Sequence, residues 1–523
     1  MDQKSSQNKR IAKNTLLLYI RMLFIMGVSL FTSRIVLKTL GIEDYGIYNA
    51  VGGTIALLGL LTSSLSTSCL RYFTYELGKE NGMSMNRIFS LTLTIHVVLA
   101  IIVLVVGEIA GFWFINSEMN IPQSRLVAAN AVYQCAMLSF FITLITIPYN
   151  TLMIAHERMS AFAYIGVFDV LLKLLLITGL SYCSSFSDKL IGYGIILMLV
   201  TFSSQLVHVL YCRRCFSESN YHFIWDRKRV VEMSGFAGWS FMGTGAGVLR
   251  DHGVNLLINV FCGPTVNAAR GISYSLSSAV NSFVRNFMVA INPQITKSYA
   301  SGNEKNTKQL VHRGSLFTFY ILLILALPIL FETKFILSLW LNDYPYQTIL
   351  FVRLLLVLSM MDTFSNTLNT LQLATGKIRT YQIVVGIVGM LNLPFSYLSL
   401  RQGEPASTTI MIAITLSFVC LILRLQLLQK MISFSMSNYL TQVVCKSMLV
   451  AICALPLPTI LYSVIPEGVS RFVLLSVLSI FGTSVIVYAL GCSVSERAFI
   501  RNNCIDLMHR IIVFLRINRY RSI

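Results

Sequence analysis

Apolar runs of about 20 residues recur along nearly the whole chain, and a helix of that length crosses the hydrocarbon core of a bilayer. The chain has 523 residues, of which 55% are hydrophobic and only 12% are charged. A soluble chain carries about 25% charged residues, so these charges are too few to cover the surfaces of two or three soluble domains. We therefore predict an all-α integral membrane protein with about fourteen transmembrane helices.

The expected spans follow one another with short gaps and no inserted soluble domain. They are 15–37, 47–69, 89–115, 126–149, 160–183, 189–211, 234–260, 268–291, 314–339, 348–371, 381–400, 407–429, 445–465 and 471–491.

The Lys and Arg residues gather in alternate gaps and at both ends of the chain, whereas the intervening gaps carry few. The positive-inside rule then places both termini in the cytoplasm and the chain, as a multi-pass protein, in the bacterial inner membrane. The net charge of +19 would suggest nucleic acid on a soluble protein. Here topology and anionic lipid headgroups account for it, so we expect membrane lipids and no nucleic acid as partners.

Few sequence motifs point to an enzyme or a metal site. Cys212 and Cys215 form one CxxC pair, but a zinc site needs a second pair or histidines at ligand spacing, and neither is near. A Walker A motif is also missing, so ATP is not expected to drive the protein directly. We expect no catalytic residues, no metal and no cofactor.

Three short stretches repeat at similar offsets. Residues 150–158 match 369–377, 49–53 match 267–271, and 78–81 match 302–305, each in an equivalent place relative to its span. The matches predict two parallel six-helix repeats with a central site between them, followed by two C-terminal helices. The expected parts are a basic cytoplasmic N-terminus (1–14), an N-lobe (15–211), a cytoplasmic inter-lobe linker (212–233), a C-lobe (234–429), spans 13 and 14 (445–491) and a basic cytoplasmic tail (492–523).

Several charges lie inside spans that are equivalent across the repeat. A lipid-facing Arg near the middle of the bilayer costs about 2.5–3.5 kcal/mol, so these side chains should face protein or a wet cavity. A cavity with excess positive charge suits an anion, and the planar fork of arginine suits phosphate. The predicted substrate-binding cations are Arg21, Arg34, Arg250, Arg270 and Arg285, with Asp251 and His252 as candidate coupling or titrating groups.

Other interpretations of some of these charges stay open. Arg34 and Arg270 lie near the outer ends of their spans and could simply extend to the interface. Asp169 and Lys173 are one helical turn apart, which favours a self-neutralised structural pair over an ion-coupling site. A looser structural pairing is expected between Arg353 and Asp362, which share one span.

The region 10–90 resembles a known family. The residues that carry this likeness are Arg10-Ile11-Ala12-Lys13-Asn14-Thr15, Arg34-Ile35-Val36-Leu37 and the turn Gly41-Ile42-Glu43-Asp44-Tyr45-Gly46-Ile47-Tyr48. They look like the Wzx-type O-antigen flippases of the multidrug/oligosaccharidyl-lipid/polysaccharide exporter superfamily. The resemblance is specific at the level of the superfamily and is compatible with all the expected spans.

The resemblance implies a V-shaped pair of six-helix lobes. It also implies a flippase for undecaprenyl-pyrophosphate-linked glycans, which moves polysaccharide or O-antigen repeat units from the inner to the outer leaflet. Cationic cavity residues would attract pyrophosphate or acidic sugars, and an H⁺ or Na⁺ gradient would drive transport. Glycan-assembly proteins are expected partners, and a monomer is favoured. Span 1 departs from the multidrug relatives, because it carries Arg21 and Arg34 in place of a cation-binding acidic residue.

Two alternatives come from other functional classes. A cation-coupled multidrug exporter of the same superfamily should have acidic cavity residues, whereas the candidates here are mostly basic. A membrane glycosyltransferase or polymerase needs acidic catalytic groups and a sizeable outer loop. Glu43 and Asp44 lie in an outer loop, but that loop is short and reads as a turn.

Overall fold

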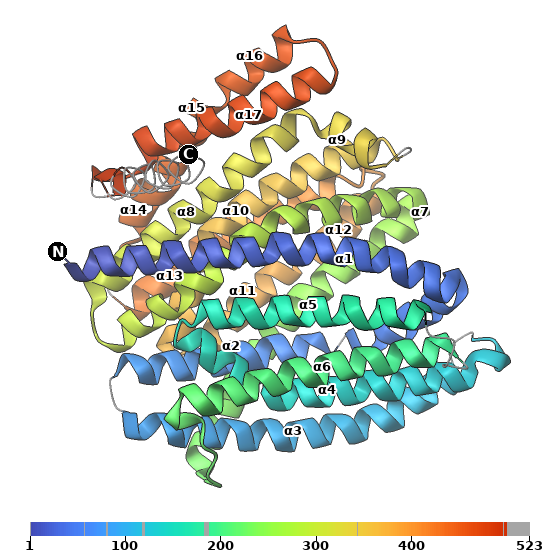
Figure 1. The fold of residues 1–523 in the computed structure, drawn as a ribbon. Coiled ribbons are helices and arrows are strands. Elements are labelled where there is room, and N and C mark those ends of the chain that lie inside the picture. The colour runs from blue at the N-terminus through green and yellow to red at the C-terminus, as the bar shows by residue number, and fades with distance from the viewer. Residues whose placement is uncertain are drawn as a thin grey trace, which may run out of the picture.

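The computed structural model describes residues 2–56, 58–79, 82–117, 121–182, 188–341, 344–432, 434–494, 496–498 and 501. Within these ranges the regular structure is entirely helical, as the apolar runs predict (Figure 1). The predicted tail beyond 501 lies outside the described residues.

The first half of the chain forms one helical bundle, the N-lobe (Figure 1). Its helices are α1 (Asp2–Ala56), α2 (Gly59–Gly78), α3 (Gly82–Ser117), α4 (Leu126–Ala155), α5 (Met159–Tyr182) and α6 (Lys189–Cys215), with the short 3₁₀ turns η1 (Gln123–Arg125) and η2 (Ser217–Ser219).

The second half forms the C-lobe and a C-terminal group of helices. The C-lobe comprises α7 (Arg227–Ala300), α8 (Glu304–Phe331), α9 (Thr333–Trp340), α10 (Gln347–Thr375), α11 (Arg379–Met390), α12 (Asn392–Arg401) and α13 (Thr408–Met431). The C-terminal group comprises α14 (Met436–Tyr439), η3 (Leu440–Cys445), α15 (Lys446–Ala454), α16 (Pro456–Val464), α17 (Val469–Ile486) and η4 (Val487–Gly491).

Eleven helical stretches in the described part of the chain are long and apolar enough to cross a membrane. Three further predicted spans, 47–69, 234–260 and 268–291, are helical over most of their length but do not meet the same test. The first is divided between α1 and α2, and the other two are the arms of α7. All three spans lie where the two predicted repeats face each other. Helices that face protein can carry polar residues that lipid-facing helices cannot.

The two halves share backbone features at repeat-equivalent positions. The long helices α1 and α7 each turn back at a glycine, Gly41 (φ 78°, ψ 174°) and Gly263 (φ 83°, ψ 173°). The matched stretches 150–158 and 369–377 each place a left-handed residue at the same point, Glu157 (φ 56°) and Gly376 (φ 77°). Similar sequence in the two halves therefore folds into similar turns.

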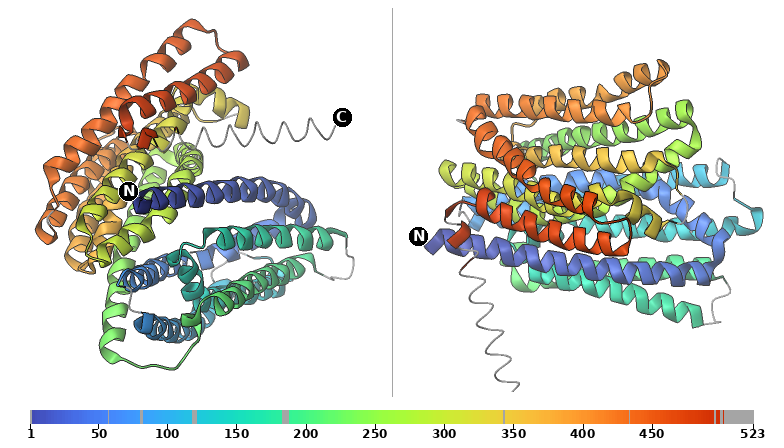
Figure 2. Two further views of the ribbon diagram at one scale, coloured as in Figure 1. Left: turned by 60° about the vertical axis from the view of Figure 1, so that its left-hand side comes forward. Right: turned by 90° about the horizontal axis from the view of Figure 1, so that it is seen from above.

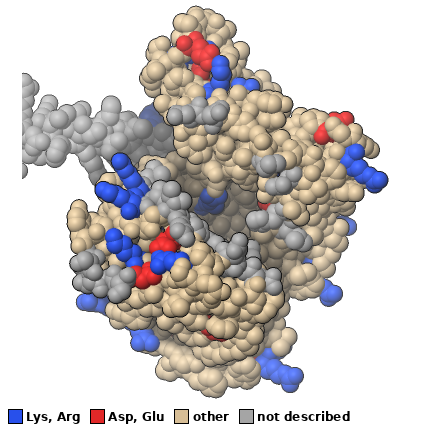
Figure 3. Space-filling view, turned by 90° about the vertical axis from the view of Figure 1, so that its right-hand side faces the viewer, with Lys and Arg blue, Asp and Glu red and all other residues tan. Residues whose placement is uncertain are grey.

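The lobes meet at one end of the molecule and part at the other. We call the end that carries the N-terminus the inner end, after the predicted orientation. Across it, a Cβ atom on Gly78 would lie 2.6 Å from the Ala300 Cβ atom, so α2 and α7 nearly touch there. Figure 2 shows the two bundles inclined to each other, and Figure 3, which faces the outer end, shows a hollow with basic side chains inside it.

The turn that carries the family likeness is held by charge at the outer end. Arg125 of η1 donates to Asp44 of this turn and also pairs with Asp188, at 2.8 Å between Nη1 and Oδ2. Asp188 in turn caps α6 by accepting from the Leu190 amide. The Arg125 guanidinium thus holds together three connections at the outer end of the N-lobe: the turn at Asp44, η1 and the start of α6.

The C-terminal helices are fixed to α8 near both of its ends. Glu332, directly after α8, pairs with Arg471 of α17 at 2.6 Å, and both side chains are buried. At the inner end, Arg313 of α8 pairs with Glu496 at 2.9 Å. In the interior, the Tyr439 hydroxyl donates to the Ser315 Oγ atom at 2.7 Å. The predicted spans 13 and 14 are therefore packed firmly on the C-lobe.

Two boundaries differ from the sequence prediction. The helical path of span 13 begins at Met436 and not at 445, because Ser435 caps it by accepting from the Asn438 amide. The predicted linker 212–233 is shorter, since α6 continues to Cys215 and α7 begins at Arg227. The residues between them are docked on the N-lobe, where Asn86 donates to the carbonyl groups of Glu218 and Asn220.

Candidate functional site

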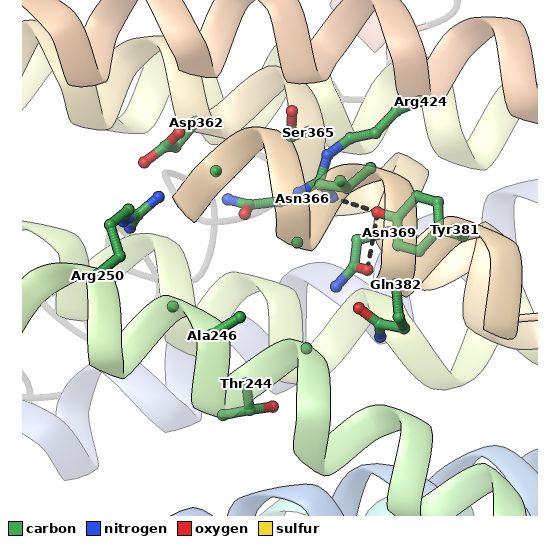
Figure 4. Close-up of a pocket in the computed structure, with 15 residues that line it drawn as sticks. Thr244, Ala246, Arg250, Asp362, Ser365, Asn366, Asn369, Tyr381, Gln382 and Arg424 are labelled. Atoms are coloured by element: carbon green, nitrogen blue, oxygen red, sulfur yellow. Dashed lines mark hydrogen bonds between the residues drawn. The ribbon is translucent and has the colours of Figure 1, made fainter. Parts of the chain in front are cut away.

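A polar cavity of about 370 Å³ lies inside the C-lobe. It is lined from four helices: α7, α10, α11 and α13. Its charged residues are Arg250 from α7, Asp362 from α10 and Arg424 from α13, and Figure 4 shows them around one space. A cluster of this kind inside a membrane-spanning bundle marks a candidate functional site, because buried charges are costly in lipid.

Arg250 is one of the predicted cations, and the structure places it at this cavity. Its Nε atom donates to the Asp251 Oδ1 atom of the neighbouring residue at 2.9 Å. The rest of its guanidinium faces the cavity, across from Asp362 in Figure 4. Asp251 thus offsets part of the charge of Arg250 but bonds only to its Nε atom.

Arg424 is a cation that the sequence prediction missed. Its Nη1 atom donates to the Tyr381 hydroxyl, which itself donates to the Asn369 Oδ1 atom at 3.0 Å. Its Nε atom is buried without a hydrogen-bond partner, and no carboxylate among the described residues lies within ion-pair distance of Arg424. An unpaired guanidinium in a membrane protein's interior calls for water or an anion beside it.

Asp362 does not form the predicted pair with Arg353. Its Oδ1 atom accepts a hydrogen bond from the Ser417 hydroxyl at 2.6 Å, and its charge faces the same cavity as Arg250 and Arg424. Arg353 is exposed and does not line this cavity. The two residues are nine positions apart in α10, which is about two and a half helical turns, so they lie on opposite faces of the helix and well apart along its axis.

Uncharged polar groups complete the cavity wall. The carboxamides of Asn366 and Gln382 have no hydrogen-bond partner among the described residues, and Figure 4 shows them beside the charged groups. Glycines supply the remaining surface: a Cβ atom on Gly243 would lie 2.1 Å from the Gln382 Oε1 atom. The missing side chain therefore allows Gln382 to lie against α7.

The other two predicted cations of α7 lie outside this cavity. Arg270 is 4% exposed and braces the two arms of α7 by donating to the Asp251 carbonyl, the Asn255 Oδ1 atom and the Tyr274 hydroxyl. Arg285 is exposed and donates to Ser278 and Ser282 of its own helix. Its neighbour Asn286 donates to the sulfur of Met22 in α1, so Arg285 lies near the seam between the lobes.

Span 1 places its two arginines in different surroundings. Arg34 is exposed. Arg21 turns into the N-lobe, where its guanidinium lies over the Phe162 ring at 4.4 Å and against Gly166. Asp169 is within electrostatic range of both Arg21 and Lys173, but no direct ion pair joins Asp169 to Lys173. The expected two-residue pair is therefore part of a looser three-charge cluster.

The described part of the structure offers no cluster of metal ligands. Among its residues, no three His, Cys, Asp or Glu side chains are grouped to hold a metal ion. The side chain of His252, predicted as a titrating group, lies outside the described part of the structure.

An ionic contact closes the inner end between the lobes. Glu157, in the turn between α4 and α5, pairs with Lys297 of α7 at 3.2 Å and accepts from the Gln294 amide at 3.1 Å. At the repeat-equivalent turn, Gly376 lies against Arg71 of α2. Arg71 is itself held among the rings of Tyr72, Tyr75 and Phe236.

Comparison with known proteins gives a clear answer for the fold alone. No family model matches the sequence, and no curated protein sequence matches it either. Solved structures do match. A MATE protein in complex with MaD3S has a TM-score of 0.70 at 13% identity, covering 81% of this chain and 97% of that one.

Two further matches describe the same architecture. A multidrug resistance MATE family transporter of the MOP superfamily, in an outward-facing conformation, has a TM-score of 0.69 at 14% identity and covers 80% of this chain and 95% of that one. A MOP superfamily transporter from Pyrococcus furiosus, whose binding pocket is described as reversed in polarity, has a TM-score of 0.66 at 12% identity and the same coverage. This multi-pass membrane protein therefore has the fold of the MATE transporters of the MOP superfamily.

Proposed function

We propose that this protein is a flippase for anionic lipid-linked glycans, which carries undecaprenyl-pyrophosphate-linked repeat units from the inner to the outer leaflet by alternating access. The observation that carries the proposal is the charge of the C-lobe cavity: Arg250 is paired with Asp251, but no carboxylate among the described residues lies within ion-pair distance of Arg424. A site for a drug cation needs the opposite balance, because like charges inside a low-dielectric protein repel strongly.

The arrangement of the lobes supports transport by rocking. The inner end is closed by Glu157 and Lys297, while the outer end has a hollow with basic side chains (Figure 3). Such an outward-open state would release a substrate on the outer side, and separation of the inner contacts would admit the next one. The MOP transporter with reversed pocket polarity shows that this fold also occurs with an altered pocket charge.

Arg285 is our candidate for the pyrophosphate. It is exposed, lies near the seam and has only hydroxyl and carbonyl partners from its own helix in the described structure. Its fork is therefore available for a phosphate group, which arginine binds through paired charge-assisted hydrogen bonds. Alternating access would expose a seam residue to each side in turn.

Deletion of the gene tests the proposal. Lipid-linked repeat units should accumulate on the inner leaflet while their synthesis continues, and surface glycan should fall. Arg285→Gln should restore surface glycan at least tenfold less well than the wild type at equal membrane insertion, because a charge-assisted contact contributes about 1.5–3 kcal/mol. Arg353→Gln is the matched control, since Arg353 is exposed outside the cavity.

Each alternative predicts a different result. A multidrug exporter would leave surface glycan unchanged on deletion and increase the sensitivity of cells to cationic drugs. An enzyme of glycan assembly would leave no completed lipid-linked units. Either result would overturn the flippase proposal.

A further inference from the structure

Three exposed aromatic side chains lie close together in the segment between α6 and α7 (residues 216–226). Tyr221, Phe223 and Trp225 are 42%, 74% and 59% exposed, respectively. We propose that this segment is an anchor at the inner surface of the bilayer, and that its partner is the headgroup layer of anionic phospholipids. The inference concerns a surface outside the C-lobe cavity and does not depend on what the protein transports.

The hydrogen bonds of the segment place it along α3. Asn86 holds its first half, as described above. One turn further along α3, the Ser90 Oγ atom accepts from the His222 amide at 3.2 Å. After another turn, the Thr94 Oγ1 atom forms a hydrogen bond of 3.2 Å with the Tyr221 hydroxyl. The segment therefore lies beside three successive turns of α3, at the edge of the N-lobe (Figure 1).

Those turns of α3 lie at the level of the lipid headgroups. The apolar stretch Met85–Ser117 has 33 residues, and a helix of that length rises about 50 Å. The hydrocarbon core is only about 30 Å thick, so roughly two turns at each end of the stretch extend into the headgroup layer. Asn86 and Ser90 lie within these turns, and Thr94 follows one turn deeper. The attached segment is therefore at the depth where Trp and Tyr are enriched in membrane proteins.

The extended backbone explains how the three rings can share one side of the segment. Asn220 (φ −71°, ψ 114°) and Asp226 (φ −125°, ψ 97°), which bound the stretch 221–225, are both extended. Alternate side chains of an extended chain point to the same side, so Tyr221, Phe223 and Trp225 form a row. Such a row would leave an apolar patch exposed in water, whereas the headgroup layer accommodates it.

The charges that flank the row are mainly positive. Exposed cations precede and follow it: Arg213, Arg214, Arg227 and Lys228. The carboxylates of the segment already have partners, because Asp226 pairs with Arg229 at 3.7 Å. Glu218 accepts from His156 at 2.6 Å. Residues 213–232 contain five Lys and Arg and three Asp and Glu, so they keep a positive excess even when every carboxylate is counted. Anionic headgroups balance that excess.

The fluorescence of Trp225 tests the anchor. The chain has four Trp residues, and in full-length protein with Trp113, Trp239 and Trp340 changed to Phe only Trp225 reports. This protein is reconstituted into vesicles of equal parts phosphatidylglycerol and phosphatidylcholine. A nitroxide near the glycerol end of a lipid chain should quench Trp225 at least twofold more than a nitroxide near the methyl end. Iodide, present on both sides of the membrane, should quench it weakly.

Two results would overturn the anchor. One is strong quenching by iodide together with weak quenching by both lipid probes, which is what a docking surface for a soluble partner protein would give. The other is stronger quenching by the nitroxide near the methyl end, which would place Trp225 in the hydrocarbon core.

The same protein tests the choice of headgroup. A nitroxide near the glycerol end should quench Trp225 about twofold more when phosphatidylglycerol carries it than when phosphatidylcholine does, at equal mole fraction. Arg227→Gln with Lys228→Gln should remove this preference but keep the dependence on depth, because the rings are retained. The matched control is Lys305→Gln with Lys430→Gln, which removes two exposed cations outside the segment and should keep the preference. Equal quenching by the two lipids, or a preference that survives the loss of both segment cations, would overturn the assignment of anionic headgroups as the partner.

Discussion

Glu157 and Lys297 pair across the two lobes at 3.2 Å, although they are 140 residues apart in the chain. The Glu157 side chain is 4% exposed, and Gln294 also donates to its carboxylate. The left-handed backbone of Glu157 is rare for a residue with a side chain, and the repeat-equivalent position is Gly376. The ionic contact with the other lobe accounts for a glutamate at a position that favours glycine.

Lys297→Gln should shift the protein toward an inner-open state. Removal of the lysine weakens the contact between the lobes by at most about 3–5 kcal/mol, which is the cost of breaking a fully buried ion pair. A cysteine at Ser298, which is 5% exposed, reports the change through labelling from the inner side. Labelling should increase severalfold. The doubly exchanged variant Glu157→Lys with Lys297→Glu should restore part of the protection, and unchanged labelling in Lys297→Gln would contradict the prediction.

Gly376→Ala should destabilise the protein more than Gly403→Ala. Both glycines have left-handed backbone (φ 77° and 85°), where a Cβ atom costs about 1–2 kcal/mol. A Cβ atom at Gly403 would meet open space, whereas one at Gly376 would lie 2.4 Å from the Arg71 Nη2 atom. Arg71 cannot move easily, because three rings hold it. Thermal unfolding in detergent measures the difference. Equal losses of stability in the two variants would show that the Arg71 side chain moves to make room for the added Cβ atom.

Glu332→Gln should loosen the C-terminal helices. The change leaves Arg471, which is 9% exposed, without its carboxylate, at a cost of about 3–5 kcal/mol. Glu467→Gln is the control, because its pair with Lys334 is exposed at the surface and contributes at most about 1 kcal/mol. Thermal unfolding compares the two variants. Similar stabilities would show that the buried pair is replaceable by a neutral hydrogen bond.

Acid should weaken the docking of the segment between α6 and α7. The Nε2 atom of His156 donates to the Glu218 carboxylate at 2.6 Å, and the imidazole ring stacks on Phe216 with centroids 4.3 Å apart. Burial lowers the pKa of His156 from its usual value, although Glu218 partly raises it. A lowered pKa in the folded state means that the unfolded state binds the proton more readily. The stability contribution is therefore complete above about pH 6.5 and is lost as the pH falls below that value.

Proteolysis of the 216–226 segment at several pH values measures this docking. Cleavage should become faster as the pH falls through about 6.5 in the wild type. His156→Gln should remove that part of the pH dependence. A wild-type profile that is flat between pH 7.5 and 5.5 would contradict the prediction.

The apolar runs and the internal matches predicted the helical membrane fold well, because span length and turn geometry are local properties of the sequence. The candidate site was only partly predictable. Arg250 is predictable because it interrupts an apolar run, and Arg424 interrupts the run 407–429 in the same way. The pairing of Glu157 with Lys297 could not be predicted, because it depends on how two lobes meet. Asp362 was assigned to Arg353 from chain proximity, whereas helix packing places it with α7 and α13.

The attachment of the C-terminal helices to α8 makes the C-lobe side of the molecule larger than the N-lobe side. Ion pairs near both ends of α8 require these helices to turn together with the C-lobe. The C-lobe side therefore displaces more lipid than the N-lobe side for the same angle of rotation. In the transport cycle that we propose, the smaller body would rotate further in the viscous bilayer, so the N-lobe would swing while the larger assembly would act as the frame.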